Sequence, residues 1–280
     1  MPPFGTFRQV DDGDFAALTL IDGQGRDVNE DCLVTCDSRR WYLKCLVSGK
    51  VASKELLAYL LSDGIANVAE VRRVTPAMQI MRRGEVPVHA PEGSAIIVRL
   101  VQDYSPEELP LRSLDEAVAS ELVYSLWIRR RDTHVGNKGY VDGVPMFFDH
   151  HIAFDECVDA ESGCVFFDRD DDGGYAGTWT LREIPAEAKA DLEELRLVSG
   201  REGRAIHFVH SRKAVDRHLD FFAERISELS DESVRELVGE CGLAGEAAVR
   251  VERNLQITRA SLWDDVELLR MQLGLRAGAG

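Results

Sequence analysis

Two acids and one amide near the middle of the chain have the residue types and spacing of a phosphoryl-transfer site. Asp132 stands five residues before Asn137, and Asp149 follows the next apolar segment. Mg²⁺ prefers octahedral oxygen coordination and takes one or two carboxylates, which leaves its other positions for water and nucleotide phosphates. Asn137 and Asp149 are therefore the candidate magnesium ligands. Asp132 is the candidate acid that orients or deprotonates an acceptor hydroxyl.

The residues between Asn137 and Asp149 have the pattern of a β-hairpin. Two short apolar segments, 138–141 and 144–148, flank Asp142-Gly143, which is a common turn sequence. A hairpin would bring Asn137 and Asp149 side by side. Upstream, an apolar periodic segment over 114–130 predicts the helix that leads into the loop containing Asp132.

A phosphate-binding lysine and its acidic partner are expected upstream of this loop. Lys44 lies within the aromatic and aliphatic segment 41–47, which predicts a strand. A buried lysine needs a partner, because an unpaired charge in an apolar environment is costly or shifts its pKa. Glu55 begins the helical segment 54–61 and is the expected partner, with Glu70 as the alternative.

The order of these motifs resembles the HipA-like kinases and, more distantly, the phosphoinositide kinases. The shared features are a lysine in a strand, an acid on the next helix, an Asp-x-His-x-x-Asn loop, and an Asp-His pair before Ala-Phe. They fall within residues 40–155. One departure is Thr133, which stands where the family usually has arginine.

The resemblance implies an α+β, two-lobed protein-kinase-like fold with ATP and Mg²⁺ in the cleft. The β-rich N-lobe would take residues 1–102, and the mainly helical C-lobe residues 103–280. The hinge is expected at the apolar segment 94–101 and the three residues after it, where the main chain of Val98 and Leu100 would contact the nucleotide base. The implied acceptor is a serine or threonine of a protein or peptide, with a small-molecule alcohol as the alternative.

The histidines around these acids allow a different hypothesis. His134, His150 and His151 with the two aspartates have ligand types suited to a transition metal, and a metal-dependent hydrolase would use such a cluster to activate water. The sequence has no His-Glu-x-x-His spacing. We therefore expect His134 to organise the catalytic loop beside Asp132. A nucleotide-binding pseudokinase and a nucleotidyl transferase remain further alternatives.

Charge and cysteine usage limit the partners. The 280-residue chain has a formal net charge of −16, which argues against nucleic acid and anionic membrane surfaces as partners. Its six cysteines include no Cys-x-x-Cys pair and are expected to be reduced thiols. No leader peptide and no apolar run of membrane-spanning length are apparent, so we expect a soluble, cytoplasmic protein.

Periodicity gives the coarse order of elements. Residues 15–100 alternate short β-like runs with one helix that begins near Ser53, and an acidic surface loop is expected at 168–172. The remainder is predicted to be helical, over 186–197, 212–230, 232–241, 246–257 and 262–273.

Overall fold

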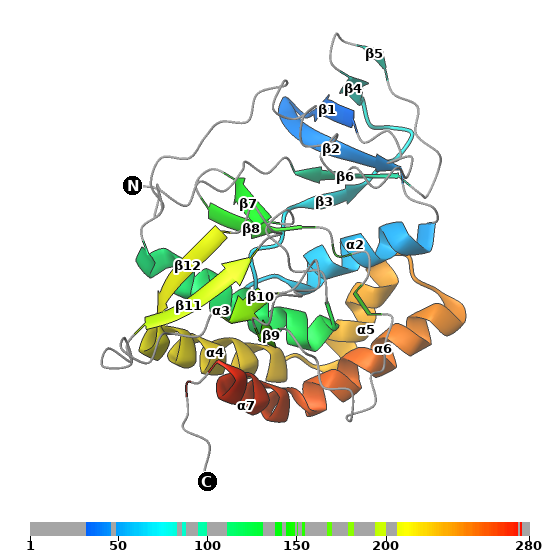
Figure 1. Ribbon diagram of the computed structural model, residues 1–280. Helices are drawn as coiled ribbons and strands as arrows, with labels where there is room; N and C mark the ends of the chain where they lie inside the picture. Colours follow the sequence, from blue (N-terminus) through cyan, green and yellow to red (C-terminus); the bar gives the residue numbers. More distant parts are fainter. Residues whose placement is uncertain are drawn as a thin grey trace.

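The protein has an α+β architecture in which an antiparallel sheet lies above a group of helices (Figure 1). The computed structural model describes residues 32–45, 49–82, 86–87, 95–99, 111–130, 138–141, 144–148, 150, 153–154, 167–169, 179–181, 194–199, 206–273 and 275. The α+β class expected from the sequence is confirmed.

The larger sheet has six strands in the order β3-β6-β2-β1-β4-β5, and each neighbouring pair is antiparallel. Strands β1 and β2 form a hairpin whose two turn residues, Asp37 and Ser38, both have positive φ (52° and 61°). Such turns match the twist of the paired strands. The strands are β1 (Cys32–Cys36), β2 (Arg39–Cys45), β3 (Val71–Arg73), β4 (Met81–Arg82), β5 (Val86–Pro87) and β6 (Ala95–Arg99).

Both faces of this sheet are covered, which explains the uninterrupted apolar sequence of β6. Ala95 and Ile97 pack with Trp41 on one face, and Ile96 and Val98 pack on the other. The second face is covered by α2 (Gly49–Leu61), which lies between the sheet and the remaining helices (Figure 1). The opposite side of α2 belongs to the main apolar core of the helices.

The helices that form this main core follow the sequence prediction closely. Ser211 and Ser230 cap α4 and α5 by accepting a hydrogen bond from a main-chain N–H three residues later. The predicted helices at 212–230, 232–241, 246–257 and 262–273 are confirmed with small differences at their ends. The helices are α3 (Leu111–Ile128), α4 (Arg212–Ser227), α5 (Asp231–Glu240), α6 (Gly245–Ala260) and α7 (Leu262–Gln272).

A four-stranded sheet, in the order β12-β11-β10-β9, corrects the sequence prediction for the middle of the chain. Residues 194–197 were expected to end a helix, but they lie in β11, which pairs with β12 over six residues. Asp168 and Arg169, which were expected in an acidic loop, lie in β9, and residues 170–172 of that expected loop lie outside the described residues. The strands are β9 (Phe167–Arg169), β10 (Trp179–Leu181), β11 (Glu194–Ser199) and β12 (Ile206–Ser211).

The hairpin predicted downstream of Asn137 is present. Strands β7 (Lys138–Val141) and β8 (Val144–Phe147) pair in the register Lys138 to Phe147. The end of β8 also joins the connection between α2 and β3, because Phe147 exchanges main-chain hydrogen bonds with Asn67 and Ala69 (2.7 and 2.8 Å). Among the described residues, no helix combines the length and apolar character needed to cross a membrane.

Candidate functional site

The alternation of β2 places Lys44 on the face of the sheet that α2 covers. Trp41 and Leu43 point to the opposite face, where they are almost fully buried. Because successive strand residues point to opposite faces, Tyr42 and Lys44 share the face toward α2. Lys44 is paired in register with Ile96 of β6, which packs on this same face.

Glu55 meets Lys44 from α2. Three residues of this helix, Ala52, Leu56 and Tyr59, pack against the sheet, and Glu55 is one turn from Ala52 and Tyr59. Its Oε1 atom lies 3.6 Å from Nζ of Lys44, and the two side chains are 1% and 13% exposed. The predicted partnership of Lys44 and Glu55 is thus present as an ion pair that is largely removed from water.

The Glu55 carboxylate also holds the segment that follows β8. Its Oε2 atom accepts a hydrogen bond of 2.9 Å from the main-chain N–H of His150. The buried His150 ring stands nearby, with Nδ1 at 4.0 Å from the same oxygen. One carboxylate therefore connects β2, α2 and the residue directly after Asp149.

A second buried cation connects the end of α3 to the end of β8. Helix α3 stops at Ile128, and Arg129 takes a left-handed conformation with φ of 55°. The chain then turns the Arg130 side chain inward, where it is fully buried. Arg130 donates to the Phe148 carbonyl oxygen (2.9 Å) and to a Glu121 carboxylate oxygen (3.4 Å). Residues that flank Asp132 and Asp149 are therefore held together.

The segment after His150 is fixed against α3 and α6. Phe154 donates its main-chain N–H to the Ile128 carbonyl oxygen at 3.0 Å. The Asn254 side chain of α6 donates to the Phe154 carbonyl oxygen at 3.2 Å, and the Thr258 hydroxyl donates to the Trp127 carbonyl oxygen at 2.7 Å. These contacts support both flanks of the candidate site from the side of the helices.

Several of the expected site residues lie outside the described residues. This group holds the expected acid, loop organiser, metal ligands and one hinge residue, which are Asp132, His134, Asn137, Asp149 and Leu100. Val98 is described and buried. It lies within β6 between Tyr42 of β2 and Val71 of β3.

Glu70, the alternative partner for Lys44, is engaged elsewhere. Its carboxylate accepts from Arg72 at 2.6 to 2.7 Å and lies 3.9 Å from Nη1 of Arg39. The hydrogen bonds with Arg72 run along the edge strand β3. Of the two acids considered for Lys44, Glu55 is the one that the structure pairs with it.

Sequence reasoning missed one buried tyrosine that braces α2. The Tyr124 hydroxyl, on α3, donates to the Ala58 carbonyl oxygen of α2. The N–H of Ser62 would bond this carbonyl in a regular helix, but it donates to Tyr59 instead. Tyr124 thus supplies the missing donor, and its ring stands edge-on to His150 with centroids 6.4 Å apart. A lone tyrosine inside an apolar helix signals only that its hydroxyl needs a partner.

We expect Tyr124→Phe to lower the free energy of unfolding by about 1–3 kcal/mol, because it leaves a buried carbonyl without its donor. Chemical denaturation measures this difference. Tyr59→Phe, on a partly exposed tyrosine of α2, is the matched control and should change stability by less. Equal effects of the two substitutions would contradict this role for Tyr124.

The same hydroxyl makes the stability of the protein depend on pH. Burial raises the pKa of Tyr124 well above its usual value of 10.0, with Arg130 opposing the shift. The folded state therefore keeps this proton at pH values where the unfolded chain releases it, so stability falls as pH rises above about 10. Chemical denaturation between about pH 8 and about pH 11, the range of tyrosine titration, measures this effect. We expect the free energy of unfolding to fall less steeply with rising pH in Tyr124→Phe than in the wild type.

The described residues hold no group of three or more His, Cys, Asp or Glu side chains arranged to bind a metal ion. The expected ligands Asn137 and Asp149 are not among these residues. Comparisons of the chain with models of protein families, with curated proteins and with solved structures found no match.

Proposed function

We propose that this protein is an ATP- and Mg²⁺-dependent phosphotransferase of the HipA-like type, with a two-lobed kinase-like arrangement. The observation that carries the proposal is the buried Lys44–Glu55 pair, which joins a central strand of the sheet to the helix that covers it. A lysine on a strand that is held by an acid on the following helix is the arrangement protein kinases use to position nucleotide phosphates.

The links between the pair and the chain around Asp149 support the same proposal. A kinase needs its phosphate-binding lysine, its metal-binding acid and its catalytic loop in one place. Glu55 bonds the residue after Asp149, and Arg130 bonds the residue before it. Arg130 itself stands two residues before Asp132. The described chain therefore brings together the neighbours of the residues that the proposal requires.

Each residue has a separate role in this proposal. Lys44 holds nucleotide phosphate, and Glu55 orients Lys44. Asn137 and Asp149 bind Mg²⁺, which neutralises charge on the phosphates when it is bound. Asp132 orients or deprotonates the acceptor hydroxyl, and His134 orders its loop. The acceptor is a serine or threonine of a protein or peptide, or alternatively the hydroxyl of a small molecule.

Transfer of label from γ-labelled ATP, followed together with ADP formation, tests this function. We expect Asp149→Asn to lose both nucleotide binding and turnover. Asp132→Ala should keep binding but lose about 100- to 10,000-fold in transfer rate, the range for removal of a general base. Asp264→Asn and Asp264→Ala change an exposed aspartate of α7 and should match the wild type.

The alternatives give different results in this assay. A pseudokinase would bind Mg-ATP without ADP formation in the wild type. A metal-dependent hydrolase would cleave a phosphoester without ATP. Turnover by the wild type that survives both Asp149→Asn and Asp132→Ala would contradict the proposed roles.

A further inference from the structure

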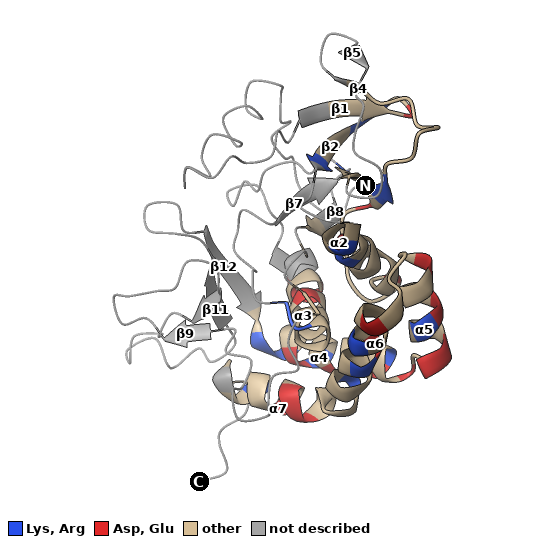
Figure 2. Cartoon of the chain, turned by 90° about the vertical axis from the view of Figure 1, so that its right-hand side faces the viewer, with Lys and Arg blue, Asp and Glu red and all other residues tan. Residues whose placement is uncertain are grey.

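A cavity of about 300 Å³ lies between the start of α2 and the connection from α5 to α6. Four residues of the structure line it from α2 and β3, and four from the α5–α6 connection and α6: Gly49, Lys50, Ser53, Arg73, Gly242, Leu243, Ala244 and Ala247. In the view of Figure 2, α2, α5 and α6 lie next to one another, in agreement with the packing of α2 on α5.

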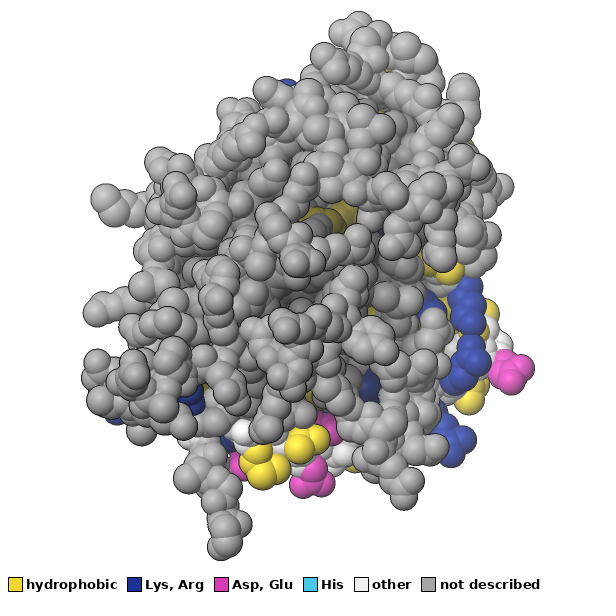
Figure 3. All heavy atoms as spheres, in the orientation of Figure 1, with side chains coloured by type: hydrophobic (Ala, Val, Ile, Leu, Met, Phe, Trp, Pro, Cys, Tyr) yellow, Lys and Arg dark blue, Asp and Glu magenta, His cyan; other side chains and the backbone are white. Residues whose placement is uncertain are grey.

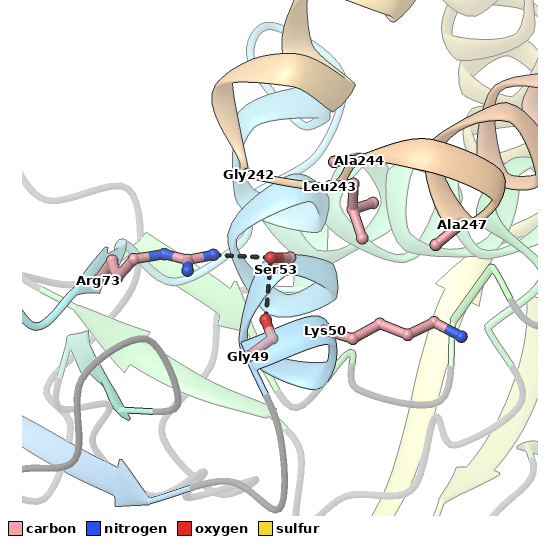
Figure 4. Close-up of a pocket in the computed structure, with 8 residues that line it drawn as sticks. All are labelled: Gly49, Lys50, Ser53, Arg73, Gly242, Leu243, Ala244 and Ala247. Atoms are coloured by element: carbon pink, nitrogen blue, oxygen red, sulfur yellow. Dashed lines mark hydrogen bonds between the residues drawn. The ribbon is translucent and has the colours of Figure 1, made fainter.

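Two basic side chains line this cavity. Arg73 and Lys50 are its charged members, and none of the described residues that line it is acidic. Figure 4 shows Arg73 reaching Ser53 from one side of α2, while Lys50 extends on the other side. Glu246, the acid of the first turn of α6, is exposed and does not line the cavity. Lys and Arg side chains also gather along the edge of the molecule where α5 and α6 lie (Figure 3).

The polar groups of the cavity are fixed by hydrogen bonds. Nη2 of Arg73 donates to the Ser53 hydroxyl oxygen (2.6 Å) and to the Cys241 carbonyl oxygen (2.8 Å). The Ser53 hydroxyl in turn donates to the Gly49 carbonyl oxygen at 2.9 Å. The guanidinium is thus anchored at the cavity wall before any ligand arrives, which lowers the entropy cost of binding.

The start of α6 adds donors to the same space. Its N-cap residue is Ala244, which has no side-chain acceptor for the first main-chain N–H groups of the helix. Such groups need an acceptor from a side chain, from water or from a ligand. An oxyanion at the start of α6 would meet these groups together with the Lys50 ammonium, while Arg73 would add positive charge from the cavity wall.

We propose that this cavity binds a small oxyanion, of the phosphate or carboxylate class. The site is separate from the Lys44–Glu55 pair and does not rest on the proposed function. Because Ser53 stands two residues before Glu55 on α2, a bound anion would contact the helix that positions this pair.

Calorimetric titration of inorganic phosphate into the full chain, at constant ionic strength, tests the proposal. We expect millimolar binding by the wild type and a loss of at least about tenfold in Lys50→Glu, because a charge-assisted contact becomes a repulsion. Lys213→Glu is the matched control, since Lys213 is also exposed and is also the second residue of a helix. It should bind phosphate as the wild type does.

A second variant examines the start of α6 directly. Ala244→Asp places a carboxylate at the N-cap, where it accepts from the first-turn N–H groups in place of the anion. We expect a raised melting temperature together with loss of phosphate binding.

Three results would overturn the proposal. The first is no phosphate binding by the wild type. The second is an equal loss in Lys213→Glu, which would mark a general charge effect. The third is binding that survives Lys50→Glu but is lost in Lys44→Met, which would place the phosphate at the proposed nucleotide site instead.

Discussion

Replacing Glu55 by glutamine is expected to lower the free energy of unfolding by about 3 kcal/mol, because it leaves the Lys44 ammonium in a mostly buried position without its carboxylate. The amide oxygen of glutamine still accepts the N–H of His150, so the substitution isolates the loss of charge. Phosphoryl transfer should fall by about 100-fold, the usual effect of misplacing a reacting group by about 1 Å. Denaturation and transfer assays measure the two effects.

The double variant Lys44→Met/Glu55→Gln separates stability from function. Removing both charges should recover part of the lost stability, because a buried ion pair costs desolvation free energy that an apolar side chain avoids. Transfer should not recover, since the phosphates lose their cation. Glu252→Gln is the control, because its partner Arg235 is 61% exposed and the pair should contribute less than about 1 kcal/mol. Equal stabilities of Glu55→Gln and the wild type would contradict the inferred role of Glu55.

Arg130→Leu is expected to have the second large effect, a loss of about 3–5 kcal/mol in the free energy of unfolding. The substitution removes the guanidinium from the buried Glu121 carboxylate and from the Phe148 carbonyl oxygen. It also frees the end of α3 from the end of β8. The rate of phosphoryl transfer should therefore fall even at a temperature where the variant remains folded.

Two variants control this experiment. Arg130→Leu/Glu121→Gln should be more stable than Arg130→Leu alone, because the buried carboxylate is neutralised. Arg235→Leu makes the same substitution at an exposed arginine of α5, whose ion-pair partner is Glu252 of α6, and should cost less than about 1 kcal/mol. A stability loss of similar size for Arg130→Leu and Arg235→Leu would show that the buried arginine does not hold the two segments together.

Much of the site's framework was predictable from local patterns. The aromatic and aliphatic run of residues 41–47 and the apolar sequence of 94–101 indicate strands, and both strands are present as β2 and β6. The Lys44–Glu55 pair follows from a single argument, that a lysine inside such a strand needs an acid from a neighbouring element. Sequence alone left Glu70 open as the partner; the structure pairs Glu70 with Arg72 instead.

The rest depends on contacts between distant parts of the chain. Tyr124 and Ala58 are 66 residues apart, and nothing in the local sequence selects one carbonyl of α2 as the acceptor. Nothing in the local sequence indicates what Arg130 contacts, and its partner Phe148, directly after β8, becomes apparent once the hairpin is placed. The prediction of a helix over 186–197 was wrong at its end. Residues 194–199 form β11, which pairs with the distant strand β12.

The most direct test of the central claim is calorimetric titration of ATP with Mg²⁺ into the wild type and into Lys44→Met, Asp149→Asn and Lys213→Glu. The proposed function predicts about micromolar binding that requires Mg²⁺, is at least about tenfold weaker in Lys44→Met and Asp149→Asn, and is unchanged in Lys213→Glu. No binding by the wild type, or equal binding by Lys44→Met, would contradict the assignment of the Lys44–Glu55 pair to a nucleotide site.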